Sequence, residues 1–198
     1  MAEIGISDQG TCIVPVVREA LGQLDETLTL GRVVLVRKAE HHFTVFGYPM
    51  GKLWKKAFAL QPGLRALLDA CVKAHEWSFR PSERVVHLVQ AEPALQTVIL
   101  GIEADLAGLF AKARAMVAPE ALSAELDRAL RDPPPPHVTL YTTDPAGQRG
   151  IGLRTVRDLE DALARGRGGV ADGLLAFVLH PPLVFAPLEP PVAGPLPA

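Results

Sequence analysis

Two copies of one short pattern stand out among the residues that could do chemistry. HFTV at residues 42–45 and HVTL at residues 137–140 each place a histidine two positions before a threonine, with apolar residues alternating. Two imidazoles beside one phosphorus could serve as general base and general acid near neutral pH. Threonine hydroxyls could donate hydrogen bonds to the phosphate oxygens. The pattern predicts phosphodiester cleavage, without a metal ion or other cofactor, by His42, Thr44, His137 and Thr139.

The strands that carry these patterns must present the polar side chains together. Residues 41–47 form a run typical of a β-strand. Because side chains alternate between the two faces of a strand, His42 and Thr44 are expected to share one face, with Phe43 on the other. His41 then points away from the site and is interpreted as a packing or surface residue. The second pattern presents its histidine and threonine in the same way.

Four further residues are candidates for substrate binding. Tyr141 is expected on the strand face of the second pattern, where it either contacts a base or phosphate or packs in the core. Tyr48 closely follows the first pattern. Lys52 belongs to a lysine cluster that is either a solvated helix face or a phosphate-attracting surface. Arg149, within the glycine-rich segment GQRGIG, is another candidate for binding an anion. The glycines there match neither a Walker loop nor a dinucleotide-binding fingerprint.

The composition narrows the function class. The chain has 198 residues and a formal net charge of −2, which argues against a protein that coats long nucleic acid through a basic surface. The N-terminus lacks the pattern of a signal peptide, and no apolar run approaches the roughly 18–20 residues that cross a membrane. We therefore expect a cytoplasmic monomer that acts on a small nucleotide or an RNA end and has no membrane partner.

Strand-like and helical runs mix without strict alternation, which predicts an α+β fold with largely antiparallel strands. A single domain is expected over residues 1–185, followed by a proline-rich tail over 186–198. Strands are predicted over residues 11–17, 32–37, 41–47, 84–90, 96–103, 137–141 and 174–180. Helices are predicted over 51–75, with a break at Pro62-Gly63, and over 106–117, 123–131 and 156–165.

The paired patterns resemble the motifs of the two-histidine (2H) phosphoesterase superfamily, which includes the bacterial RNA 2′,3′-cyclic phosphodiesterases once called 2′-5′ RNA ligases. The context is similar too: Phe46-Gly47 follows HFTV, a TVILGIE strand and a helix precede HVTL, and a proline directly precedes His137. The resemblance spans roughly residues 33–179. It implies a bilobal fold with two mostly antiparallel sheets, helices outside, pseudo-twofold symmetry and a central cleft where the motifs meet.

The activity that this resemblance implies is hydrolysis of a cyclic, 2′,3′-type phosphodiester of a small nucleotide or RNA end. Two alternatives stay open. A module of the same fold could bind a nucleotide or phosphate without turnover, although a catalytic set preserved in both halves disfavours it. A 2′-5′ RNA ligase would run the reverse chemistry, and the absence of an overall basic surface disfavours that reading.

Overall fold

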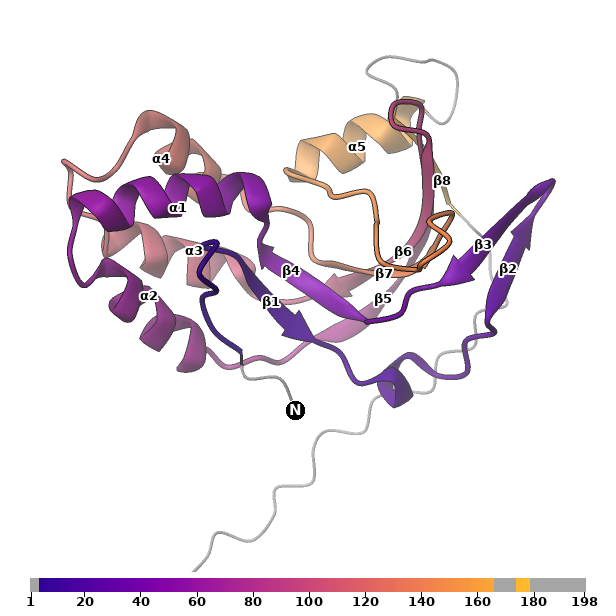
Figure 1. Cartoon of the computed structure of the whole chain (residues 1–198), viewed down its shortest axis with the longest axis horizontal. Coiled ribbons are helices and arrows are strands. Elements are labelled where there is room, and N and C mark those ends of the chain that lie inside the picture. Colours follow the sequence, from indigo (N-terminus) through magenta and orange to yellow (C-terminus); the bar gives the residue numbers. More distant parts are fainter. Residues whose placement is uncertain (1–3, 166–173, 179–198) are drawn as a thin grey trace, which may run out of the picture.

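The computed structural model describes residues 4–165 and 174–178 and has an α+β fold (Figure 1). In these ranges one antiparallel sheet of eight strands runs in the order β1-β4-β7-β6-β5-β8, and a β2–β3 hairpin joins it through β7. The strands are β1 (Cys12–Pro15), β2 (Thr27–Leu30), β3 (Val33–Arg37), β4 (His42–Phe46), β5 (Arg80–Gln90), β6 (Leu95–Glu103), β7 (His137–Thr142) and β8 (Leu174–Val178).

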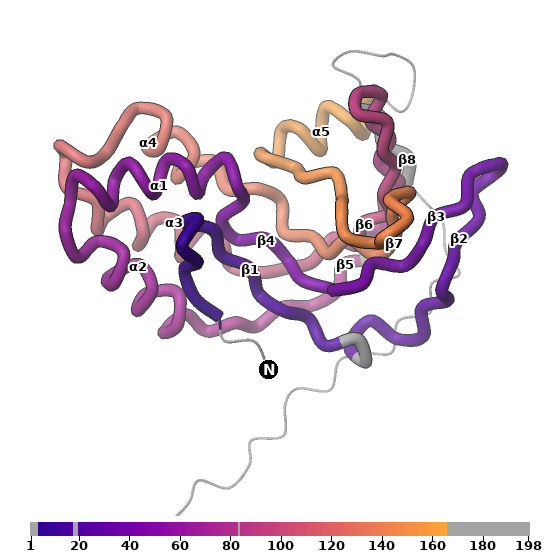
Figure 2. Tube along the Cα trace, viewed as in Figure 1, coloured from indigo at the N-terminus to yellow at the C-terminus, as the bar shows by residue number. Residues whose placement is uncertain are grey.

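Four helices lie together at one end of the sheet, and a fifth lies on the opposite face (Figures 1 and 2). Local signals set their ends: Gly63 adopts a left-handed φ of 84° between α1 and α2, and the Ser123 side chain caps α4. The helices are α1 (Tyr48–Leu60), α2 (Leu64–Lys73), α3 (Leu106–Ala115), α4 (Ala124–Arg131) and α5 (Val156–Arg165), with a short 3-10 helix at Arg18–Leu21.

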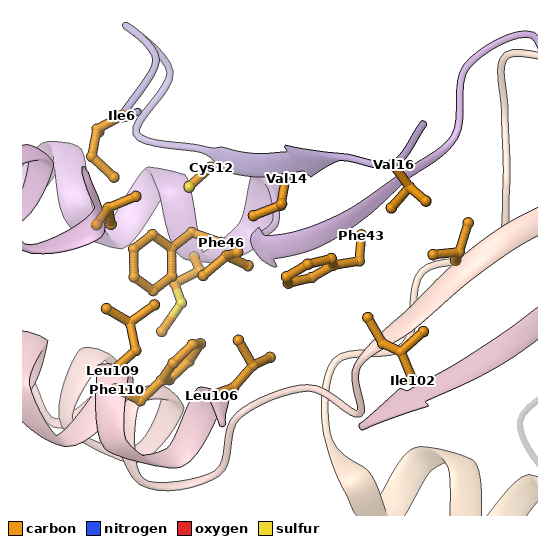
Figure 3. Packing of buried hydrophobic residues seen from close by; sticks show 14 of the residues in the cluster. Ile6, Cys12, Val14, Val16, Phe43, Phe46, Ile102, Leu106, Leu109 and Phe110 are labelled. Carbon is orange, nitrogen blue, oxygen red and sulfur yellow. The ribbon is translucent and has the colours of Figure 1, made fainter. Parts of the chain in front are cut away.

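The larger core lies between one face of the sheet and α1 to α4. Phe43 and Phe46 of β4 point from the sheet toward Phe110 of α3 (Figure 3), and the Phe46 and Phe110 ring centroids are 5.2 Å apart. Phe43 has no exposed surface, and its ring also meets Trp77 at 5.6 Å. This packing holds one face of β4 against the core, so the polar residues of the first motif lie on the opposite face of the sheet.

A second, smaller apolar cluster covers the other face of the sheet beside α5. Ile99 of β6 belongs to it and is the strand partner of Thr139, so the cluster adjoins the second motif on the same face. Its buried members are Val86, Leu88, Ile99, Ile151, Leu153 and Ala162. The polar motif residues therefore lie next to the edge of this cluster.

The structure confirms the α+β class, the mainly antiparallel pairing and the helix break at Pro62-Gly63. The expectation of two sheets is not confirmed, because β4 pairs with β7 and joins the strands of both halves in one sheet. Sequence analysis missed β2, which pairs with β3 across a turn at Gly31. The end of the predicted 174–180 strand and the tail at 186–198 lie outside the described residues.

Candidate active site

The two motifs lie side by side because β4 and β7 pair directly. The pairing is antiparallel, and the central apolar residues of the two motifs are opposite each other. In this register His42 lies opposite Thr139, and Thr44 lies opposite His137. Directly opposed residues in such a pair are about 5 Å apart, and diagonal neighbours about 7–8 Å apart between Cα atoms. The four side chains therefore form a square on one sheet face, with the imidazoles on a diagonal.

The burial pattern agrees with this placement. His42, Thr44, His137 and Thr139 are half-buried, whereas the residues between and after them are buried. Neither threonine hydroxyl has a hydrogen-bond partner among residues 4–165 and 174–178, and neither is buried away from solvent. Both hydroxyls are therefore free to donate to a ligand. The expected sharing of a face by each histidine and its threonine is confirmed.

His137 has a defined tautomer when neutral. Its Nδ1 lies 2.7 Å from the backbone carbonyl of Pro135, which can only accept, so Nδ1 carries the proton and Nε2 has a lone pair. The run of prolines before the strand fixes this carbonyl. Burial lowers the pKa of His137, the bond to Pro135 opposes that effect, and the charge of His42 lowers the pKa further.

His42 differs in its surroundings. Its Nδ1 is buried and has no hydrogen-bond partner among the described residues, which leaves Nε2 as the reachable nitrogen. Burial lowers the pKa of His42, the positive charge of Lys38 lowers it further, and Glu40 acts in the opposite direction. A buried N–H without an acceptor is costly, so the neutral ring keeps its proton on Nε2.

Lys38 is a functional candidate that sequence analysis missed. Its side chain is only 7% exposed, and its ammonium donates to the backbone carbonyl of Gln148. Burial lowers the pKa of Lys38, while the carboxylates of Asp144 and Glu40 oppose that effect. Lys38 thus joins the segment before the first motif to the loop after the second and places a positive charge near His42.

The loop that follows β7 carries Arg149 and passes against Thr139. The Asp144 carboxylate accepts hydrogen bonds from the backbone N–H groups of Gln148 and Arg149 at 2.8 and 2.9 Å, which holds the loop closed. Gly150 lies so near Thr139 that a Cβ atom there would be 3.2 Å from the threonine Oγ1. The backbone hydrogen bonds from Arg149 and Gln148 lower the pKa of Asp144, and the positive charge of the exposed Arg149 side chain lowers it further.

Tyr141 lies outside the site, which corrects its expected position. Thr139 is opposite Ile99 but Tyr141 is opposite Val98, so Leu140 is an extra residue in a β-bulge. The bulge reverses the alternation and turns Tyr141 into the larger core. There its side chain is 2% exposed, and its hydroxyl donates to the backbone carbonyl of Asp25 at 3.3 Å.

Tyr48 and Lys52 lie beyond the Thr44 end of the square, at the start of α1. The Lys52 ammonium is 4.7 Å from the centroid of the Tyr48 ring, so the two side chains contact each other. Gly47, just before Tyr48, lies against the Thr44 methyl group. Tyr48 is 60% exposed and available to a ligand that extends in this direction.

A second missed residue, Arg84, lies on the same sheet face. Gly101 is the strand partner of His137, and a Cβ atom on Gly101 would be 2.6 Å from the Ser82 Oγ and 3.5 Å from the Arg84 Cβ. The Ser82 hydroxyl and the start of the Arg84 side chain therefore lie against the strand partner of His137. Arg84 is exposed and, within the described ranges, forms no ion pair. The sequence showed a basic strand residue here but not the strand register that carries it to His137.

An open pocket of about 550 Å³ adjoins the His42 end of the square. Its walls come from β1 and the residue after it, from the end of β3 through the start of β4, and from Glu26 just before β2. The lining residues are Ile13, Pro15, Val16, Glu26, Arg37, Lys38, Ala39, Glu40, His41 and His42. His41 thus borders this pocket, although it is not a member of the square.

No group of three or more His, Cys, Asp or Glu side chains among residues 4–165 and 174–178 is arranged to hold a metal ion. No helix in the same ranges is long and apolar enough to cross a membrane. Comparison of the chain with protein-family models, with curated proteins and with solved structures finds no significant match.

Proposed function

We propose that this protein is a phosphodiesterase that hydrolyses a cyclic, 2′,3′-type phosphodiester of a small nucleotide or RNA end by paired-histidine catalysis, without a metal ion. One observation carries the proposal. The motif centres are strand partners, so His42 and His137 lie on a diagonal about 7–8 Å across between Cα atoms, a distance suited to one phosphate between the rings. We propose further that it acts as a cytoplasmic monomer.

The symmetry of the pairing supports the resemblance to the 2H superfamily. In an antiparallel pair, a twofold axis through the central residues exchanges His42 with His137 and Thr44 with Thr139. A pseudo-twofold enzyme with one phosphate on this axis is the simplest arrangement compatible with the pairing.

The two rings are suited to opposite roles. Neutral His137 presents a lone pair at Nε2, because its Nδ1–H is held by Pro135. His137 is therefore the general base. The nitrogen of His42 that reaches the site is Nε2. The protonated, positively charged ring is the proton donor and gives up its proton from this nitrogen. Burial and the positive charge of Lys38 disfavour the protonated ring in the free protein, and the negative charge of the bound phosphate stabilises it.

The reaction then follows from these positions. His137 removes a proton from water as the water oxygen bonds to phosphorus, and His42 donates its proton to the ribose oxygen whose bond to phosphorus breaks. Thr44, Thr139 and the Arg84 guanidinium donate to the non-bridging oxygens, where negative charge develops. The product is a nucleoside monophosphate, and proton exchange with solvent restores both rings.

The direct test uses a panel of nucleoside 2′,3′-cyclic phosphates and short RNAs with cyclic phosphate ends, each incubated with the protein in EDTA. We expect ring opening to a single monophosphate isomer. Failure to open any member of the panel would refute the proposed activity. Binding without turnover, seen as ligand-induced thermal stabilisation, would favour the phosphate-binding module instead. Joining of broken RNA halves would favour the ligase.

The dependence of kcat/KM on pH should be bell-shaped, with its maximum below pH 6.5. On the acidic side, kcat/KM rises with pH as the general base loses its proton. On the alkaline side, kcat/KM falls as the general acid loses its proton. The pKa values of His42 and His137 are both lowered from 6.5, so the midpoint between the limbs falls below that value. Measurement of kcat/KM across the pH range checks this, and a maximum above neutrality would contradict it.

Replacing Arg84 should weaken capture of the phosphate. Arg84→Ala is expected to lower kcat/KM by roughly tenfold, because a charge-assisted hydrogen bond at an exposed site is lost. Arg84→Lys should recover part of the loss, since a charge remains but the guanidinium geometry does not. Arg32→Ala, which removes an exposed arginine from the β2–β3 turn, is the matched control. Equal rates for Arg84→Ala and the control would exclude Arg84 from the site.

A further inference from the structure

We propose that the pocket beside His42 holds the nucleoside of the substrate, with its base lying against Ile13 and Pro15 of β1. This inference rests on the proposed function, since it concerns the group attached to the phosphate. It adds a binding surface and a preference among bases that the motifs themselves do not contain.

The first support is position. In the β1–β4 register Ile13 is opposite Thr44 and Pro15 is opposite His42, and opposed residues share a sheet face. Both residues also line the pocket. The surface of β1 is therefore a direct continuation of the square of histidines and threonines. A nucleoside whose phosphate lies over the square reaches this surface without leaving the face.

The second support is the exposed apolar character of β1. Ile13 is 41% exposed although it lies next to a polar site, and Pro15 is also exposed. Pro15 is tolerated because β1 is at the edge of the sheet order, where a missing N–H breaks no ladder. A flat base can cover this surface and remove it from water. The pocket volume of about 550 Å³ lies within the range of small-molecule sites.

The third support is the charge of the pocket walls. The two cations there are already engaged: Arg37 Nη1 donates to the Leu24 carbonyl at 2.7 Å, and Lys38 donates to the Gln148 carbonyl. The carboxylates of Glu26 and Glu40 are exposed, and neither forms an ion pair within the described ranges. The pocket therefore offers carboxylate acceptors that suit a base that carries N–H donors.

Guanine fits this description best among the common bases. Its Watson–Crick edge carries a ring N–H beside an exocyclic amine, so it can donate two parallel hydrogen bonds to one carboxylate. The orientation of the substrate that this placement implies also agrees with the proposed chemistry. A ribose at this end places the departing oxygen near His42, the proton donor, and leaves the His137 side open to water.

The test compares two diesters, guanosine 2′,3′-cyclic phosphate and p-nitrophenyl methyl phosphate, which has no nucleoside. The readout is the ratio of their kcat/KM values. Ile13→Ala should lower this ratio by about fivefold, because the base loses part of its apolar contact. Val34→Ala is the matched control, since Val34 is 57% exposed on β3 and does not line the pocket. It should leave the ratio unchanged.

A second variant keeps the test decisive if Ile13→Ala folds poorly. Glu26→Gln, an exposed change, should lower the preference for the guanosine substrate over the uridine substrate. An unchanged preference in Glu26→Gln, or an unchanged ratio in a folded Ile13→Ala protein, would overturn the assignment of the pocket while leaving phosphodiester cleavage intact. If the parent protein turns over neither diester nor any cyclic nucleotide, the proposed function itself fails.

Discussion

The His137→Ala protein is expected to lose roughly a hundredfold to ten-thousandfold of kcat/KM toward every phosphodiester, including one with an activated leaving group. In the native protein, the Nε2 atom of His137 is the only nitrogen of the two motif histidines with a lone pair directed toward the site, because the Pro135 carbonyl holds the proton on Nδ1. Removing the base slows the attack of water, and a better leaving group does not restore that step.

His42→Ala should behave differently. We expect a similar loss with a ribose leaving group and a large recovery with p-nitrophenolate, which departs without needing a proton. His75→Ala, two residues beyond the end of α2 and packed against Trp77, serves as the control and should retain full activity. The opposite pattern of recovery would exchange the two roles. Full activity in either histidine variant would exclude the paired mechanism.

The second large effect concerns stability. Phe43→Ala is expected to lower the free energy of unfolding by about 3–5 kcal/mol, because the ring has no exposed surface and leaves a cavity between β4 and the helices. For a protein of this size that corresponds to a fall in Tm of roughly 6–20 °C. The same ring packs on the face of β4 opposite the square of histidines and threonines. Because its loss disturbs the position of the square, activity should fall even at temperatures where the variant is still folded.

Thermal or urea unfolding followed by circular dichroism measures this change. Val34→Ala, on the exposed side of β3, is the control and should shift the free energy of unfolding by less than about 0.5 kcal/mol. A loss below about 1 kcal/mol in Phe43→Ala would mean that β4 does not pack in the core as described. In that case the position of His42 would need another explanation.

Local features of the fold could be predicted from the sequence. The apolar residues at alternate positions of HFTV placed His42 and Thr44 on one face, and the structure confirms that face. The Pro62-Gly63 pair predicted the helix break, because proline cannot continue a helix and Gly63 adopts a positive φ. These features depend on a few neighbouring residues, so the sequence contains enough information to predict them.

Features that depend on pairing between distant strands could not be predicted. The bulge at Leu140 reverses the alternation and moves Tyr141 into the core, although nothing in HVTLY signals it. Arg84 reaches the site only through the register of β5 on β6 and of β6 on β7. Lys38 becomes a buried group only when the loop after β7 folds over it. The single sheet likewise results from the pairing of β4 with β7.

The most direct test of the central claim is an NMR titration of the two histidines with and without guanosine 2′-monophosphate. If His42 and His137 hold one phosphate between them, both pKa values lie below 6.5 in the free protein and both rise when the ligand binds. The His42→Ala change should also raise the pKa of His137, since a positive neighbour is removed. A ligand that shifts only one of the two imidazoles, or a His137 pKa indifferent to His42, would contradict the account.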